Sequence, residues 1–184
     1  MRKLLLALFA GLVGAAALHI VIVLLVPYFA VHDVWSQIRE METDGRFAGV
    51  DDLPGAETLR NGENVPRVET RICRFEITQR PVRLSASGTV PFWSIGVFDR
   101  QSNELFSIND RTVEGQELDV ALALSSQMVT LRKEVPPALE DSVLVEVPEA
   151  EGYVMLRSVV PNASWQGSIA AFLDSARCEP LASR

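Results

Sequence analysis

The stretch that decides the fold of this chain is PFWSIGVFDRQSNELFSINDR, residues 91–111. Large apolar residues alternate with small or polar ones on both sides of a polar centre, as in two half-buried strands joined by a turn. A four-residue loop at 100–103 pairs Val97 with Phe106 and keeps the large apolar residues together on one face. A five-residue loop would mix the two faces, because a slip of one residue moves side chains to the wrong face. The stretch therefore predicts a β-hairpin.

The two faces of this hairpin differ in chemistry. The face expected to enter the core is large and apolar, with Trp93, Ile95, Val97, Phe106 and Ile108. The opposite face is small or polar, with Ser94, Gly96, Ser107 and Asn109. Asn109 and Asp110 lie where this polar face meets the following turn. We take five residues as candidate binding residues: Ser94, Ser107, Asn109, Asp110 and Arg111.

An uncharged apolar run, LLLALFAGLVGAAALHIVIVLLV, fills residues 4–26. Its length matches the roughly 20 apolar residues that cross a bilayer as a helix. A cleaved signal peptide is the alternative, but the apolar region of such a peptide is only about 7–15 residues long. We therefore expect an uncleaved anchor. Arg2 and Lys3 precede the run and Asp33 follows it, which predicts a cytoplasmic N-terminus and an inner-membrane protein whose remaining chain is periplasmic.

The charge beyond the apolar run is strongly acidic. All 24 acidic side chains lie there with 15 of the 17 basic ones, since Arg2 and Lys3 precede the run, so this part carries a net charge of −9. Nucleic-acid phosphates call for clustered Lys and Arg, so nucleic acid is not an expected partner. The expected partners are the bilayer, through residues 4–26, and a separate envelope protein.

Two cysteines, Cys73 and Cys178, are spaced across the domain. In an oxidising compartment an even pair suggests a disulfide that ties the start of the domain to its end. The alternative is two unrelated buried thiols, because free cysteine is among the most buried residue types. The sequence leaves this choice open.

The remaining chain reads as short strands with a few helices. We expect strands at 67–77 and 81–87, a strand and then a helix within 118–135 (although 120–131 also fits one helix), and a second hairpin over 142–161. Ser125 or Ser126 is the expected N-cap of the helix within 118–135. A C-terminal helix at 162–178 carries an apolar stripe, capped by Asn162 or Ser164. This order predicts an α+β fold with a largely antiparallel β-sheet and two or three helices, preceded by one N-terminal transmembrane helix.

The domain boundaries follow from this pattern. We expect a transmembrane anchor at 1–30, a juxtamembrane helix and linker at 31–66, and an extracytoplasmic α+β domain at 67–184. Within the linker, residues 48–66 are rich in Gly, Pro, Asp and Asn and show no period, which predicts a loop.

Several catalytic chemistries lack their residues. The only histidines, His19 and His32, lie in or beside the apolar run, so a catalytic triad or a zinc site in the domain is not expected. A calcium loop over 99–110 fails because Glu104 stands where an EF-hand needs glycine. An acid–base pair drawn from Asp99, Glu104 and Asp110 stays open, although such groups more often solvate a turn. We expect no cofactor and no metal.

From Arg74 to Trp165 the chain resembles the bacterial domain-of-unknown-function family 1254. The resemblance is carried by RFEITQRPVRLSASG, the hairpin stretch, QMVTLRKEVPPALEDS and VLVEVPEAEGYVMLRSVVPNASW. It implies an α+β domain and an envelope location, but no established activity. Longer relatives continue into a second domain of family 1214, which this sequence lacks. The resemblance therefore implies a separately encoded partner.

The functional expectation is a membrane-anchored periplasmic protein that acts as a non-catalytic binding or interaction module. Two alternatives are a carboxylate-dependent hydrolase or lyase that acts on a small envelope substrate, and a small-ligand binding domain that uses the polar face of the hairpin. A deep cleft with two convergent carboxylates would favour the enzyme, whereas a flat sheet face would favour the binding module.

Overall fold

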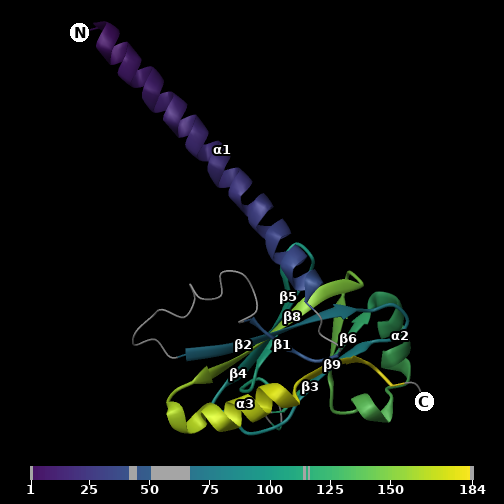
Figure 1. The fold of residues 1–184 in the computed structure, drawn as a ribbon. Coiled ribbons are helices and arrows are strands. Elements are labelled where there is room, and N and C mark those ends of the chain that lie inside the picture. The colour runs from purple at the N-terminus through teal and green to yellow at the C-terminus, as the bar shows by residue number, and fades with distance from the viewer. Residues whose placement is uncertain (1, 42–44, 51–66, 114, 116, 183–184) are drawn as a thin grey trace. The chain divides into compact units, whose positions relative to one another are not determined.

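A computed structural model describes residues 2–41, 45–50, 67–113, 115 and 117–182 (Figure 1). The chain divides into two compact units, residues 1–36 and 37–184. Of the loop expected at 48–66, Ala48 and Gly49 form a short strand instead, and residues 51–66 lie outside the described residues.

The first unit belongs to helix α1 (Arg2–Glu40). Its segment Arg2–Val26 has a mean hydropathy of 2.6, and it is long and apolar enough to cross a membrane. The helix expected separately after the apolar run is the continuation of α1, because the helical backbone runs without a break to Glu40.

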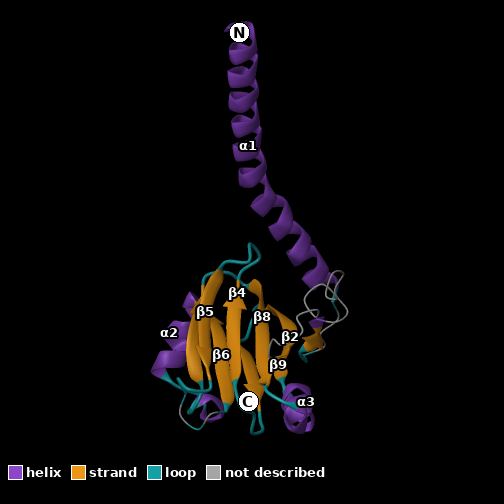
Figure 2. Cartoon of the chain, turned by 90° about the vertical axis from the view of Figure 1, so that its left-hand side faces the viewer, coloured by secondary structure: helices purple, strands orange, loops and turns teal. Residues whose placement is uncertain are grey.

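The second unit is built on two β-sheets (Figure 2). The five-stranded sheet is antiparallel and has the order β1 (Ala48–Gly49), β2 (Arg67–Glu76), β8 (Glu151–Val160), β4 (Trp93–Phe98) and β5 (Glu104–Asn109). The four-stranded sheet has the order β7 (Val143–Val147), β6 (Leu118–Leu124), β3 (Val82–Ala86) and β9 (Arg177–Pro180), with β6 and β7 parallel. The predicted α+β fold with largely antiparallel strands is confirmed.

Four helical segments complete this unit: α2 (Ser125–Lys133), η3 (Pro137–Leu139), η4 (Ala163–Trp165) and α3 (Gln166–Ser175). The predicted apolar stripe of α3 is buried in the main core through Ile169, Phe172 and Leu173. Asn162 accepts a hydrogen bond from the backbone N–H of Ser164 (3.0 Å), so it caps η4 as expected for this helix start.

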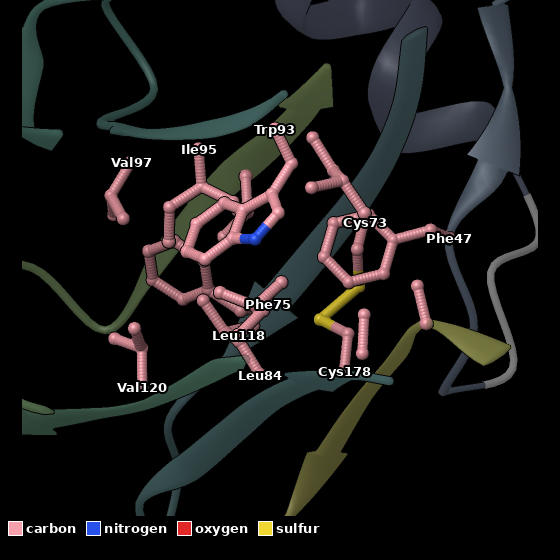
Figure 3. Packing of buried hydrophobic residues seen from close by; sticks show 14 of the residues in the cluster. Phe47, Cys73, Phe75, Leu84, Trp93, Ile95, Val97, Leu118, Val120 and Cys178 are labelled. Atoms are coloured by element: carbon pink, nitrogen blue, oxygen red, sulfur yellow. A yellow bond between two sulfur atoms is a disulfide. The ribbon is translucent and has the colours of Figure 1, made fainter. Parts of the chain in front are cut away.

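The main core lies between the two sheets (Figure 3). Trp93, Ile95 and Val97 of the five-stranded sheet and Leu84 and Val120 of the four-stranded sheet are all at most 2% exposed. Alternate residues of each strand supply this layer, as in sheets packed face to face. A second, smaller cluster joins the outer face of β6 to α2 and η3 through Ala121, Ala123, Met128, Leu131 and Leu139.

A short segment after α1 closes one side of the two sheets. Arg46 forms a β-bridge with Arg177 of β9, and Ala48 pairs with Ile72 of β2, so residues 46–48 connect both sheets. The backbone N–H of Cys178 donates to the carbonyl of Gly45 (2.8 Å). Between these contacts Phe47 is only 7% exposed and belongs to the core.

A disulfide reinforces the same side. Cys73 of β2 and Cys178 of β9 are joined, with an S–S distance of 2.10 Å and a Cα–Cα distance of 6.4 Å (Figure 3). The second compact unit begins at Gln37, and residues 45–48 within it contact strands of both sheets.

The hairpin has the predicted register at its base and a different one near its turn. Val97 pairs with Phe106, and the pairs back to Ser94 and Asn109 are the predicted ones. A bulge then makes Phe98 pair with Glu104 instead of Leu105. Ser102 adopts a left-handed backbone (φ 60°), which is typical of a three-residue loop with a bulge. The predicted four-residue loop is wrong by this one residue.

Burial within the hairpin also differs from the prediction. Trp93, Ile95 and Val97 are fully buried, but Phe106 and Ile108 are only half-buried. Their side chains face the core from β5, which pairs only with β4 and lies at the edge of its sheet. A residue on an edge strand has no neighbouring strand on one side, and water reaches it from there.

Three further expectations are wrong. The second hairpin does not form, since β7 and β8 belong to different sheets. The C-terminal helix ends at Ser175, and Cys178 lies in strand β9. The first residue of α2 is Ser125, and its start is capped by Gln127, whose side-chain oxygen accepts from the N–H of Leu124 (3.1 Å).

Replacing both Cys73 and Cys178 by alanine is expected to lower the free energy of unfolding by about 2–5 kcal/mol, because the bridge restricts the unfolded chain and joins two sheets. Urea unfolding of the full chain in mild detergent, followed by tryptophan fluorescence, measures this loss. Wild-type protein with reductant should match the double variant, which itself should not respond to reductant. An unchanged unfolding midpoint on reduction of the wild type would contradict the role given to the bridge.

Replacing Ile95 by alanine should lower the free energy of unfolding by about 2–5 kcal/mol, as for other fully buried aliphatic residues. Phe106→Ala should lower it by only about 1–2 kcal/mol, less than the roughly 3–5 kcal/mol of a fully buried phenylalanine. The same urea titration compares the two variants. A larger loss for Phe106 than for Ile95 would show that the edge of β5 is covered in solution.

Candidate functional site

The outer face of the five-stranded sheet carries a row of four polar residues. Cys73, Val97 and Val154 point into the core, so the alternate residues of their strands point outward. Cross-strand pairing places Thr70 of β2 beside Arg157 of β8, Arg157 beside Ser94 of β4, and Ser94 beside Asn109 of β5. We call these four residues, Thr70, Arg157, Ser94 and Asn109, the polar row.

Arg157 is the charged member of the polar row, and its side chain is exposed. Its guanidinium Nη2 lies 2.7 Å from the thioether Sδ of Met155, which is a weak acceptor. Within the described part of the chain no carboxylate lies within ion-pair distance of Arg157. The guanidinium is therefore positioned on the sheet without a neutralising neighbour among these residues.

An aromatic pair borders the polar row on the same face. The rings of Phe98 and Tyr153 are stacked, with centroids 5.0 Å apart and planes 12° from parallel. The Phe98 ring also covers Gly96, where a Cβ atom would come within 2.8 Å of Cε2. Glycine at this position allows the ring to lie flat on the sheet between the polar row and the hairpin loop.

Tyr153 links the aromatic pair to its charged surroundings. Burial raises the pKa of its hydroxyl, and the negative charge of Asp99 acts in the same direction, whereas the positive charge of Arg157 acts in the opposite one. Since Tyr153 is only 3% exposed, this end of the outer face is closed to solvent, whereas the polar row is not.

The end of α1 borders the face at β2. Arg74, on the same face as Thr70, donates a hydrogen bond to the carbonyl of Arg39 (3.4 Å). Ile72, between Thr70 and Arg74 on this face, is 2% exposed, and Ile38 of α1 is 1% exposed. The polar row therefore has the C-terminal end of α1 at its β2 side and the aromatic pair on the side toward the hairpin loop.

The candidate binding residues predicted from the sequence do not all lie on the same face of the sheet. Ser94 and Asn109 belong to the polar row, and Ser107 lies on the same face opposite Gly96. Asn109 also forms the following turn, because its Oδ1 accepts from the N–H of Arg111 (3.0 Å). Arg111 is exposed in that turn, and Asp110 lies on the other side of the strand.

Asp110 lines a small pocket at the end of the two sheets. The cavity has a volume of about 140 Å³, and its wall includes Trp93, Asp110 and Glu117 with Gly88, Thr89, Val90 and Gly115. The Oδ1 atom of Asp110 is buried without a hydrogen-bond partner among the described residues. Typical ligand pockets hold about 300–1,000 Å³, so this cavity is small for an organic substrate.

Asp99, a candidate for acid–base chemistry, is a structural residue of the hairpin loop. It is 8% exposed, and its carboxylate accepts from the N–H groups of Gln101 and Asn103 and from the side-chain amide of Asn103, each at 2.8 Å. These bonds hold the loop closed. In the described ranges, no three His, Cys, Asp or Glu side chains lie together as a metal site would require.

Sequence reasoning did not find Thr70 and Arg157. They come from β2 and β8. Strand β8 pairs with β2 on one side and with β4 on the other, which brings residues more than 60 positions apart in the sequence into one row. A local pattern in β4 and β5 cannot identify such neighbours. The signal that existed was the alternation in Tyr153–Val159, which places Arg157 on the face opposite Val154 and Leu156.

No family model matches this chain, and no curated protein matches it. Among solved structures, the VPA0106 protein from Vibrio parahaemolyticus is similar to 65% of this chain with a TM-score of 0.52 and 15% identity. An uncharacterized protein from Burkholderia cenocepacia is similar over 84% of this chain with a TM-score of 0.48 and 13% identity. The chain spans 28% and 41% of the lengths of these proteins, so the likeness concerns the fold of one part of each.

Replacing Asp99 by alanine should lower the free energy of unfolding by about 1–3 kcal/mol, because three donors in the hairpin loop lose their acceptor. Gln101→Ala, in the same loop, should change it by no more than about 0.5 kcal/mol, since only the backbone of Gln101 bonds to Asp99. Urea unfolding distinguishes the two. Equal, small effects would show that the loop does not depend on this carboxylate.

Proposed function

We propose that this protein is a single-pass inner-membrane protein of a bacterial envelope, related to family 1254, whose periplasmic domain is a non-catalytic binding module for another envelope protein. The apolar helix Arg2–Val26 supports the anchor. Arg2 and Lys3 before it and Asp33 after it support a cytoplasmic N-terminus.

The disulfide supports the periplasmic placement of the domain. Such bonds form and persist in oxidising compartments, which include the bacterial periplasm, and they are rare in the cytosol. The bond between Cys73 and Cys178 joins the two sheets, so it is part of the folded domain and not an accessory at its surface.

The polar row is the observation that carries the binding function. It places hydrogen-bonding side chains and an exposed guanidinium in the middle of an open sheet face. An open, nearly flat face suits the surface of another protein better than a small molecule, because small-molecule sites are concave and surround most of the ligand.

The alternative function, a carboxylate-dependent hydrolase or lyase, is favoured by one feature, the pocket with Asp110 and Glu117. Its volume is about half of the lower bound for ligand pockets, or less. Asp99, the other buried candidate, already has three donors on its carboxylate. We therefore prefer binding to catalysis.

Site-specific photocrosslinking in living cells tests this function. A photoreactive amino acid at Ser94, in the polar row, should give a discrete crosslinked species that contains a second protein. The same residue at Val129, which is 58% exposed on α2, serves as the control and should give none. Alkaline phosphatase fused after Arg184 should be active, which reports a periplasmic domain. Monomer alone at Ser94, or an inactive fusion, would contradict the proposal.

A further inference from the structure

We infer that the polar row is a carboxylate-binding site, which receives an acidic segment of the protein partner. This inference rests on the proposed function and specifies the chemistry of its interface. It is carried by three observations: the charge of the face, its hydrogen-bonding groups, and the bonding state of Arg157.

The charge around the polar row is opposite to that of the domain. The chain beyond the apolar run carries a net charge of −9, yet the outward residues from Thr70 to Arg74, from Tyr153 to Arg157 and from Ser94 to Phe98 include no acidic side chain. They include two arginines, Arg74 and Arg157. Among the described strand residues of this face, the acidic ones are Glu76, Glu151 and Glu104, all at the far end of the strands, and Arg100 lies 3.8 Å from Glu151.

The polar row is rich in hydrogen-bond donors. Arg157 offers a planar fork of N–H groups that fits a carboxylate with two parallel bonds. Thr70 and Ser94 lie on the strands on either side, each about 4.8 Å away, and contribute hydroxyl donors. In Asn109 the Oδ1 atom accepts from the N–H of Arg111, so the group left to face outward is the N–H donor side of the amide. A carboxylate, which only accepts, complements this set.

Arg157 also differs from the other strand arginines in its bonding. Arg83 of β3 forms two hydrogen bonds with Asp119, at 2.9 and 2.7 Å. Arg74 and Arg177 donate to backbone carbonyls. The partner of Arg157 is a thioether, the weakest of these acceptors. Arg157 is therefore the member of this group with the most hydrogen-bonding capacity left for a ligand.

The shape of the face favours a segment over a small carboxylate. The polar row crosses four strands, a width of about 14 Å. A single small anion on such an open surface would remain largely hydrated and screened by salt. A protein segment with several carboxylates reaches Arg157 and the flanking hydroxyls at the same time, so its contacts add within one binding event.

Fluorescence anisotropy of a fluorescein-labelled hexaglutamate peptide tests the inference, with the full chain in mild detergent at low salt. Arg157→Ala should weaken binding about tenfold, the loss expected for charge-assisted hydrogen bonds. The affinity of Arg157→Lys should lie between those of the wild type and Arg157→Ala, because lysine keeps the positive charge but lacks the planar fork of N–H groups. The matched control is Arg132→Ala. Arg132 is an exposed arginine of α2 that lies 3.9 Å from Glu146, and its alanine variant should bind the peptide with wild-type affinity.

Three outcomes of this experiment would overturn the inference. Equal losses for Arg157→Ala and Arg132→Ala would indicate attraction to overall charge. Absence of hexaglutamate binding by the wild type would remove the site, and equal competition by glutarate at the same carboxylate concentration would indicate a small-ligand site. Wild-type unfolding midpoints for both alanine variants exclude misfolding as the cause. If the crosslink at Ser94 persists in Arg157→Ala, the inference fails while the proposed function stands.

Discussion

The closure of one side of the two sheets is the constraint on which the rest of the domain depends. Residues 46–48 pair with β9 through Arg46 and with β2 through Ala48, and the disulfide between Cys73 and Cys178 joins the same two strands. Apart from this closure, the sheets are joined by the apolar packing between them and by the chain segments that run from one sheet to the other. This closure also explains why the folded body begins soon after the apolar helix.

The closed side determines what the outer face presents. With Cys73 held toward β9, the alternation of β2 turns Thr70, Ile72 and Arg74 outward. Strand β8 then pairs with β2 on one side and β4 on the other, and this central position brings Arg157 between Thr70 and Ser94. The polar row is thus a consequence of strand order. It would not exist if β8 had paired with β7, as the sequence pattern suggested.

The polar groups of the domain divide into those that hold the fold and those that the outer face presents. Its groups are donors on an open surface, and the buried carboxylate of Asp99 is engaged in holding the hairpin loop. The remaining carboxylates near a cavity, Asp110 and Glu117, lie at the end of the sheets and belong to a different region from the polar row. A protein that recognises another through hydrogen bonds across a sheet needs this separation of structural and exposed polar groups, because a donor used within the fold is lost to the partner.

The sequence by itself determined the local elements. Alternation of apolar and polar residues predicted the strands β2, β3, β4 and β5, the base register of the hairpin and the apolar stripe of α3, because side-chain period follows directly from backbone geometry. It also indicated the membrane-length helix and the polar face with Ser94, Ser107 and Asn109. Only the tertiary structure decided which strands are neighbours. Strands β7 and β8 separate into different sheets, Arg177 and Cys178 lie in a strand instead of the predicted helix, and Thr70 and Arg157 join the polar row from distant positions. Such pairings depend on contacts between residues far apart along the chain, which a local pattern does not contain.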